Sequence, residues 1–210
     1  SGLEPGATVM VACSGGADSL ALCAATVFEA RAVGVRVVGA TVDHGLQLGS
    51  DLQADRVLAQ MVALGVDETI RSRVRVDLDS GQGPEAAARE ARYAVLEQMA
   101  AHVSASLVLL GHTLDDQAET VLLGLARGSG GRSMAGMRPA FGPFVRPLLQ
   151  VRREQTRAAC RARPGTGTLL PHASIHDQTV RFQVVRRSHD AAPAAQHDRR
   201  GRDQRLRQVQ

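Results

Sequence analysis

Nearly continuous apolar runs alternate along this chain with longer segments in which apolar residues recur every three or four positions. The runs at residues 8–13, 35–42 and 106–110 are typical of strands buried on both faces of a parallel sheet. Residues 69–76 alternate instead, with arginines between the apolar positions, which predicts a strand with one solvated face. The helical period predicts helices over residues 18–33, 51–64, 85–103, 114–126 and 152–161.

The order of these elements, strand then helix four times over with short connections, favours one fold class. It predicts an α/β domain with a doubly wound parallel sheet that is covered by helices on both faces. Pro139, Pro143 and Pro147 mark an irregular segment before the last predicted helix. We expect this domain to span residues 1–162, followed by a tail of low order over residues 163–210, where no clear period remains.

A glycine turn of sequence S-G-G-A-D-S joins the first predicted strand to the first helix. Glycines let the backbone approach an anion closely, and the helix start adds unpaired N–H groups and a positive dipole end. A Walker-type loop is excluded, because the chain contains no lysine. The turn therefore predicts a phosphate or pyrophosphate cradle, with a plain connecting turn as the alternative. The residues expected around the anion are Ser14, Gly15, Gly16, Asp18 and Ser19.

Two polar residues, Asp43 and His44, follow the second predicted strand. Ligands in open α/β sheets bind beyond the carboxyl ends of the strands, so both residues are expected near the glycine turn. A polar turn after a strand is the alternative interpretation.

A second motif, G-H-T-L-D-D-Q-A-E-T, begins at residue 111, after another buried strand. On a helix, Asp116 and Glu119 lie one turn apart, and His112 precedes that helix. Acidic residues at a helix start can simply cap it. The alternative is a site for a cation, either a metal ion or an ammonium group.

Two arginines, Arg89 and Arg92, lie on one face of the third predicted helix together with Glu85. A surface ion pair between glutamate and arginine is the simple explanation. Arginine also suits forked contacts with phosphate, which is the alternative. A glycine-rich loop that includes Arg127, Gly128 and Ser129 follows the fourth helix and is expected to lie over a bound ligand.

Composition adds three expectations. Cys13, Cys23 and Cys160 show no metal-binding spacing, so the first two are expected in the core and the compartment to be reducing and cytoplasmic. No apolar run is long enough for a membrane span and no leader opens the chain, so no membrane partner is expected. The net charge of +4 arises from the tail, since residues 163–210 hold nine arginines and four aspartates.

The glycine turn resembles the S-G-G-x-D-S signature of the PP-loop ATP pyrophosphatases, whose fold is also that of the adenine nucleotide alpha-hydrolases. The helix E-A-A-A-R-E-A-R-Y and the motif at residue 111, followed by R-G-S-G and G-M, are similar to the tRNA(Ile)-lysidine synthetases. The resemblance covers about residues 8–160, the catalytic domain of that family. It departs at Ser133 and Met134, where the family has glycine and leucine, which implies a slightly altered loop.

This resemblance implies an ATP- and Mg²⁺-dependent ligase. The family adenylates the C2 oxygen of the wobble cytidine in tRNA(Ile) with a CAU anticodon, and free L-lysine then displaces AMP to form lysidine. It implies that Asp43 and His44 border the reacting centre and that Asp116 and Glu119 bind the ammonium group of lysine beside His112. Arg89 and Arg92 would face phosphate, and Asp18 is the expected Mg²⁺ ligand. A base for the lysine amine is expected but not assigned.

Three alternatives stay open. The tail is either a basic arm for tRNA phosphates or a non-native segment from a shifted reading frame, and its abrupt change of composition favours the second. A PP-loop tRNA cytidine thiolase shares the first motif, although such enzymes carry C-x-x-C cysteines that this chain lacks. A third alternative is an ATP-binding remnant that has lost turnover.

Overall fold

The computed structural model describes residues 3–43, 50–73, 84–128 and 135–161. Predicted and observed elements agree to within a few residues, and the hairpin of β5 and β6 is an addition. The elements in chain order are β1 (Thr8–Ala12), α1 (Ala17–Val33), β2 (Arg36–Asp43), α2 (Ser50–Leu64), β3 (Glu68–Arg73), α3 (Pro84–His102), β4 (Ala105–Leu110), α4 (Leu114–Ala126), β5 (Ala140–Phe141), β6 (Phe144–Val145) and α5 (Arg153–Arg161).

The six strands form one sheet in the order β3-β2-β1-β4-β6-β5. All neighbours are parallel except β5, which pairs antiparallel with β6 at the edge. The predicted doubly wound sheet is therefore confirmed, with one antiparallel edge strand that the prolines of this segment concealed. The chain turns from one side of β1 to the other at β4, which makes the β1–β4 junction the point where a ligand is expected.

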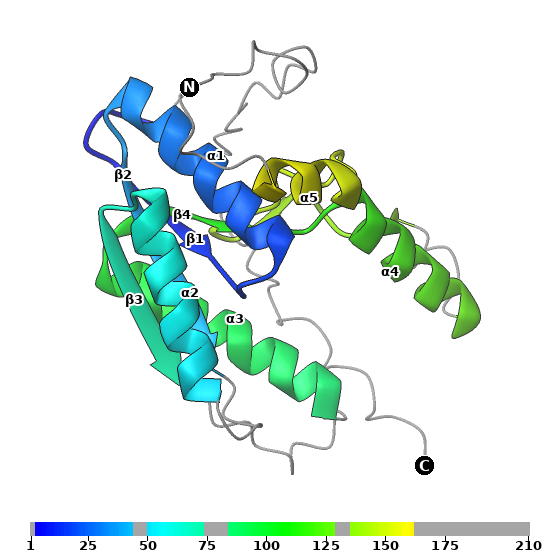
Figure 1. Ribbon diagram of the computed structural model, residues 1–210. Coiled ribbons are helices and arrows are strands. Elements are labelled where there is room, and N and C mark those ends of the chain that lie inside the picture. The colour runs from blue at the N-terminus through cyan, green and yellow to red at the C-terminus, as the bar shows by residue number, and fades with distance from the viewer. Residues whose placement is uncertain (1–2, 44–49, 74–83, 129–134, 162–210) are drawn as a thin grey trace, which may run out of the picture.

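Helices cover both faces of this sheet (Figure 1). Val9 and Val11 of β1 pack in a core cluster with residues of α1 and α2, whereas Met10 and Ala12 pack on the other face with residues of α3. Successive residues of one strand thus enter different cores, which explains why the strand is apolar throughout.

The buried face of α1 differs from the simplest expectation. Leu20, Ala21 and Ala24 would form its apolar side by composition, yet each of them is only partly buried. The residues that this helix buries are Ser19, Leu22, Cys23, Thr26, Val27 and Ala30. The helix is apolar nearly all round, so its sequence does not define a single face.

Candidate active site

The glycine turn after β1 forms a compact loop that is closed by Ser19. The Ser14 backbone N–H donates to Ser19 Oγ at 3.2 Å, and Ser19 Oγ donates to the Gly16 carbonyl at 2.9 Å. Gly15 has φ +85°, and a Cβ there would lie 2.6 Å from Val57 Cγ2. Only glycine fits at this position, because both the backbone conformation and the space exclude a side chain.

The end of β4 lies directly against the start of α1. A Cβ on Gly111 would approach the Ser19 backbone to 2.9 Å at Cα and 3.0 Å at N. This close approach brings the second motif, which begins at Gly111, beside the glycine turn. The structure therefore joins the two motifs, nearly 100 residues apart in sequence, at the β1–β4 junction.

The first turn of α4 is capped by Asp116. Its Oδ2 accepts hydrogen bonds from the backbone N–H and the hydroxyl of Thr113, at 2.7 and 2.8 Å. Burial opposes the ionisation of Asp116, but these two bonds and the charge of Arg153 outweigh it and lower the pKa of this carboxyl. The simple capping interpretation is thus correct for Oδ2, while Oδ1 takes part in a second arrangement.

That arrangement centres on Arg153, the first residue of α5, which sequence reasoning did not single out. Its guanidinium lies among three carboxylates: Asp116 Oδ1 at 2.6 Å, Glu119 Oε1 at 3.0 Å and Asp18 Oδ2 at 3.5 Å. The carboxylates predicted to bind a cation therefore contact the guanidinium of an arginine of the same chain. Arg153 lies four residues after the segment R-P-L-L, to which the sequence analysis gave no role. The spacing of charged residues around Arg153 gave no signal that it contacts these carboxylates.

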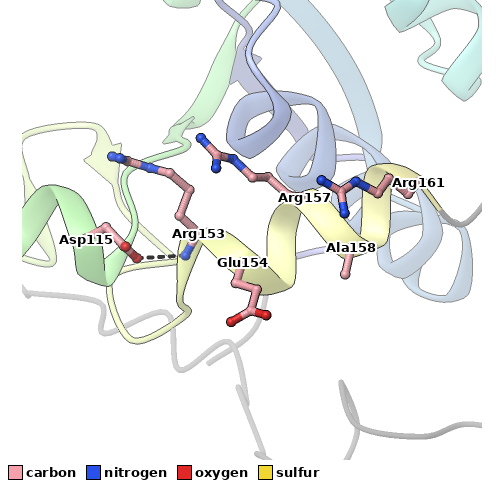
Figure 2. A pocket seen from close by; sticks show the side chains of 6 residues that line it. All are labelled: Asp115, Arg153, Glu154, Arg157, Ala158 and Arg161. Carbon is pink, nitrogen blue, oxygen red and sulfur yellow. Dashed lines mark hydrogen bonds between the residues drawn. The ribbon is translucent and has the colours of Figure 1, made fainter.

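Helix α5 is attached to both motifs by further bonds. Asp115 Oδ2 accepts the backbone N–H of Arg153 at 2.7 Å, which caps the start of α5 (Figure 2). The Thr156 hydroxyl donates to Asp18 Oδ1, and Cys160 Sγ donates to the Ala17 carbonyl. Helix α5 thus bridges the beginning of α1 and the beginning of α4 (Figure 1).

A second group of charges surrounds His112. Arg146, just after β6, donates from Nε to His112 Nδ1 at 3.1 Å. Burial lowers the pKa of His112 to about 4, and the nearby charges of Arg146, Arg92 and Arg89 act in the same direction against the opposite effect of Asp116. His112 is therefore neutral at physiological pH, in a positively charged environment.

Arg89 and Arg92 project from α3 toward this group. Arg89 lies over the ring of Tyr93 at 5.5 Å, and burial lowers the pKa of Arg92 from its ordinary value. Neither guanidinium makes an ion pair with a carboxylate of the described residues. An environment with excess positive charge suits an anion such as phosphate.

Other predicted site residues lie apart from these groups. Asp43 ends β2 and pairs with Arg73 of β3 at 3.0 Å. Arg127 and Gly128 are exposed at the far end of α4, roughly 20 Å of helix away from its capped start. The structure therefore does not bring Arg127 and Gly128 beside the glycine turn. His44 and Ser129 lie outside the described residues.

Arginines also line a surface pocket of about 460 Å³ on α5. Arg153, Arg157 and Arg161 follow one another at four-residue intervals along it (Figure 2). Arg157 and Arg161 form no ion pair within the part of the chain that the structure describes. The same part contains no cluster of three or more histidine, cysteine or carboxylate side chains suited to a metal ion.

The burial of two cysteines agrees with expectation. Cys13 and Cys23 are buried in the core, while Cys160 is exposed. Among the helices of the described residues, none combines the length and the apolar character needed to cross a membrane.

A parallel sheet with a glycine turn at the β1–β4 junction defines a class of nucleotide-binding α/β proteins. The sequence profile of the PP-loop domain, an ATP-binding family, matches residues 4–165, and the chain belongs to this family. The relatives that it resembles include tRNA(Ile)-lysidine synthases. It is 50% identical over 196 residues to a tRNA(Ile)-lysidine synthase of Streptomyces coelicolor and 53% identical over 191 residues to that of Nocardia farcinica.

These matches cover 92% and 90% of this chain but only 54% and 56% of the relatives, so the chain spans about half their length. The resemblance inferred from the motifs is confirmed. A match over 92% of 210 residues cannot lie within residues 1–162, so the similarity continues past residue 160, where the motifs indicated that it ends.

A solved structure supports the fold. The U34-tRNA thiolase NcsA from Methanococcus maripaludis, solved with its [4Fe-4S] cluster, is similar with a TM-score of 0.61 over 76% of this chain and 58% of its own. The two chains are 18% identical, so this likeness concerns the architecture alone.

Proposed function

We propose that this chain is the catalytic part of a tRNA(Ile)-lysidine synthase. One observation carries the proposal: the glycine turn and the D-D-Q-A-E motif, separate in sequence, meet at the β1–β4 junction of a chain about 50% identical to proteins of that name. Its substrates would be ATP, free L-lysine and tRNA(Ile) with a CAU anticodon, and its location the cytoplasm.

The glycine turn would hold the pyrophosphate portion of ATP. Supporting this role, Ser14 is exposed, Gly15 leaves no room for a side chain, and the start of α1 supplies backbone N–H groups. Mg²⁺ would bind through Asp18, because this ion is usually held by one or two carboxylates together with substrate phosphates. Asp18 already contacts Arg153 and Thr156, so its oxygens are held in place.

The reaction would proceed in two balanced steps. The C2 oxygen of the wobble cytidine forms a bond to the α-phosphorus of ATP, and pyrophosphate leaves. The neutral lysine amine then forms a bond to C2, AMP leaves with the oxygen, and the amine loses a proton. The residues contribute by binding and orientation, since the nucleophile belongs to the substrate.

Asp116 and Glu119 would bind an ammonium group of lysine. Both carboxylates face one cation already, the guanidinium of Arg153, which supports their suitability for a second. Asp43, His44 and His112 would border the reacting centre. Arg127, Gly128 and Ser129 remain proposed nucleotide contacts.

RNA would contact the arginine row of α5, defined as Arg153, Arg157 and Arg161. Two of these arginines have no carboxylate partner among the described residues, and they lie on the helix that borders the site. Phosphate contacts of this kind position an RNA without reading its sequence. A thiolase activity is not favoured, because no two of the three cysteines have the C-x-x-C spacing of such enzymes.

The test is transfer of labelled lysine by this 210-residue chain to unmodified CAU-anticodon tRNA(Ile), with ATP and Mg²⁺. We expect incorporation that Asp116→Asn strongly reduces and that Asp55→Asn, a change at an exposed ion pair with Arg71, leaves unchanged. ATP binding without incorporation would instead identify an ATP-binding remnant. Sulfur incorporation would favour the thiolase.

A further inference from the structure

Arg146 is an almost fully buried arginine without an acidic partner. Only 5% of its surface is exposed, and it makes no ion pair with a carboxylate of the described residues. Its guanidinium instead donates to the Arg138 carbonyl at 2.6 Å and to Tyr93 Oη at 3.2 Å, and it lies 4.4 Å from the ring of Phe141. A buried charge of this kind destabilises the fold unless hydrogen bonds satisfy it, so each partner of Arg146 matters.

A third donor of Arg146, Nε, points at His112 Nδ1 at 3.1 Å. Arginine can only donate, so Nδ1 must present its lone pair. A neutral imidazole carries one proton, which must then be on Nε2. No protein group of the described residues accepts a hydrogen bond from Nε2, so this proton remains available to a ligand.

Burial and the three nearby arginines oppose protonation of His112. A proton on Nδ1 would face the Nε–H of Arg146, and Arg89 and Arg92 of α3 add like charge, whereas Asp116 of α4 alone favours the cation. Tyr93, the other titratable group in this network, bonds to Arg146. His112 therefore has neither a free lone pair on Nε2 nor access to its charged form.

We infer that Arg146 is a positioning residue that holds His112 as the neutral Nε2–H tautomer, so that His112 donates a hydrogen bond to an anionic oxygen of the substrates. This role rests on the proposed function and narrows it. His112 would stabilise negative charge on a phosphate or on the departing AMP oxygen. The base that accepts the proton of the lysine amine must then be another group.

The tautomer is tested first, without any activity assay. Nitrogen-15 NMR of imidazole-labelled protein should show a lone pair on Nδ1 and a proton on Nε2 of His112, with no titration near the ordinary pKa of about 6.5. Arg146→Met should populate both tautomers and restore titration, while Arg36→Gln, at an exposed arginine of β2, should change nothing. A proton on Nδ1 of the unaltered protein would overturn the inference.

The role is tested by a matched pair at residue 112. His112→Gln keeps an N–H close to the Nε2 position but removes the imidazole, whereas His112→Ala removes the donor. Lysidine formation should fall roughly 100-fold or more in His112→Ala and less than roughly tenfold in His112→Gln. Equal loss in both variants, with ATP still bound, would refute the donor role. Absence of activity in the unaltered chain with the expected NMR spectrum would count against the proposed function and not against the tautomer.

Discussion

Two charged groups lie beyond the carboxyl ends of the central strands β1 and β4, and they differ in how far their charge is neutralised within the chain. The acidic group, Asp18, Asp116 and Glu119, is already neutralised in part by Arg153 of the same chain. The basic group, Arg89, Arg92 and Arg146 around His112, contains only arginines and a neutral histidine. The first must share or exchange a cation when a substrate binds, whereas the second has positive charge ready for an anion.

This difference in neutralisation predicts different effects when an anion or a cation binds. An anion that enters the basic group relieves repulsion between guanidinium groups, so its binding also stabilises the domain. A cation that enters the acidic group competes with Arg153 for the same carboxylates. Its affinity therefore depends on direct contacts with Asp116 and Glu119. We therefore expect substitutions in the acidic group to affect one substrate selectively.

The largest effect on substrate affinity is expected for Asp116→Asn. Hydrogen bonds to charged groups contribute about 1.5–3 kcal/mol, so the KM for lysine should rise roughly 10- to 100-fold while that for ATP changes little. Glu119→Gln should raise it less, because the Glu119 side chain is 59% exposed. Steady-state kinetics with each substrate varied would measure both effects. Equal changes in the two KM values would refute an ammonium-binding role.

Removal of the internal cation should cost stability. Arg153→Gln leaves three carboxylates facing one another, and we expect the free energy of unfolding in urea to fall by about 1–2 kcal/mol. Arg71→Gln, which breaks an exposed pair with Asp55, should cost about 0.5 kcal/mol or less. If the two variants are equally stable, Arg153 does not hold the acidic group together.

A smaller effect is expected on RNA affinity. Arg157→Gln or Arg161→Gln should weaken tRNA binding a few-fold and reduce the slope of log K against log salt by up to about 0.9. Arg56→Gln, at an exposed arginine of α2, is the matched control. Fluorescence anisotropy at several salt concentrations would measure this slope. An unchanged slope in both variants would exclude the arginine row from the RNA interface.

The smallest effect is the pH dependence of stability. The folded pKa of His112 is about 4, below its ordinary value, so the unfolded chain binds more protons between about pH 4 and 6.5. The free energy of unfolding should therefore fall as the pH is lowered through this window. His112→Gln should flatten the curve there, but not at still lower pH, where protonation of Asp116, whose pKa is lowered in the folded chain, also costs stability. A curve identical to that of the unaltered chain would contradict a buried neutral His112.

Much of the fold could be predicted from the sequence, because buried parallel strands and amphipathic helices have distinct periods. Local motifs likewise predicted the glycine turn and Asp116 as site residues, and in the structure Asp18 of this turn and Asp116 both contact Arg153. The hairpin of β5 and β6 was not predicted, because its strands contain two residues each and lie among prolines. So short a run carries no period.

Arg146 and Arg153 were missed for a different reason. Their partners lie more than 30 residues away in sequence, and nothing in the spacing of the arginines marks these two among 25. The sequence motif predicted that Asp116 binds a cation supplied by a ligand. In the structure the cation that contacts Asp116 is Arg153 of the same chain. Long-range charge pairing of this kind becomes visible only when the elements are packed.

The position of α5 has a consequence for synthesis on the ribosome. Domains form from the N-terminus as the chain emerges, so β1, α1 and the first turn of α4 are available before α5. Until Arg153, Thr156 and Cys160 have emerged, the carboxylates at the starts of α1 and α4 have no internal counter-charge from α5. A nascent chain that stops short of α5 would therefore carry both motifs, with carboxylates that bind free cations until α5 supplies the guanidinium of Arg153.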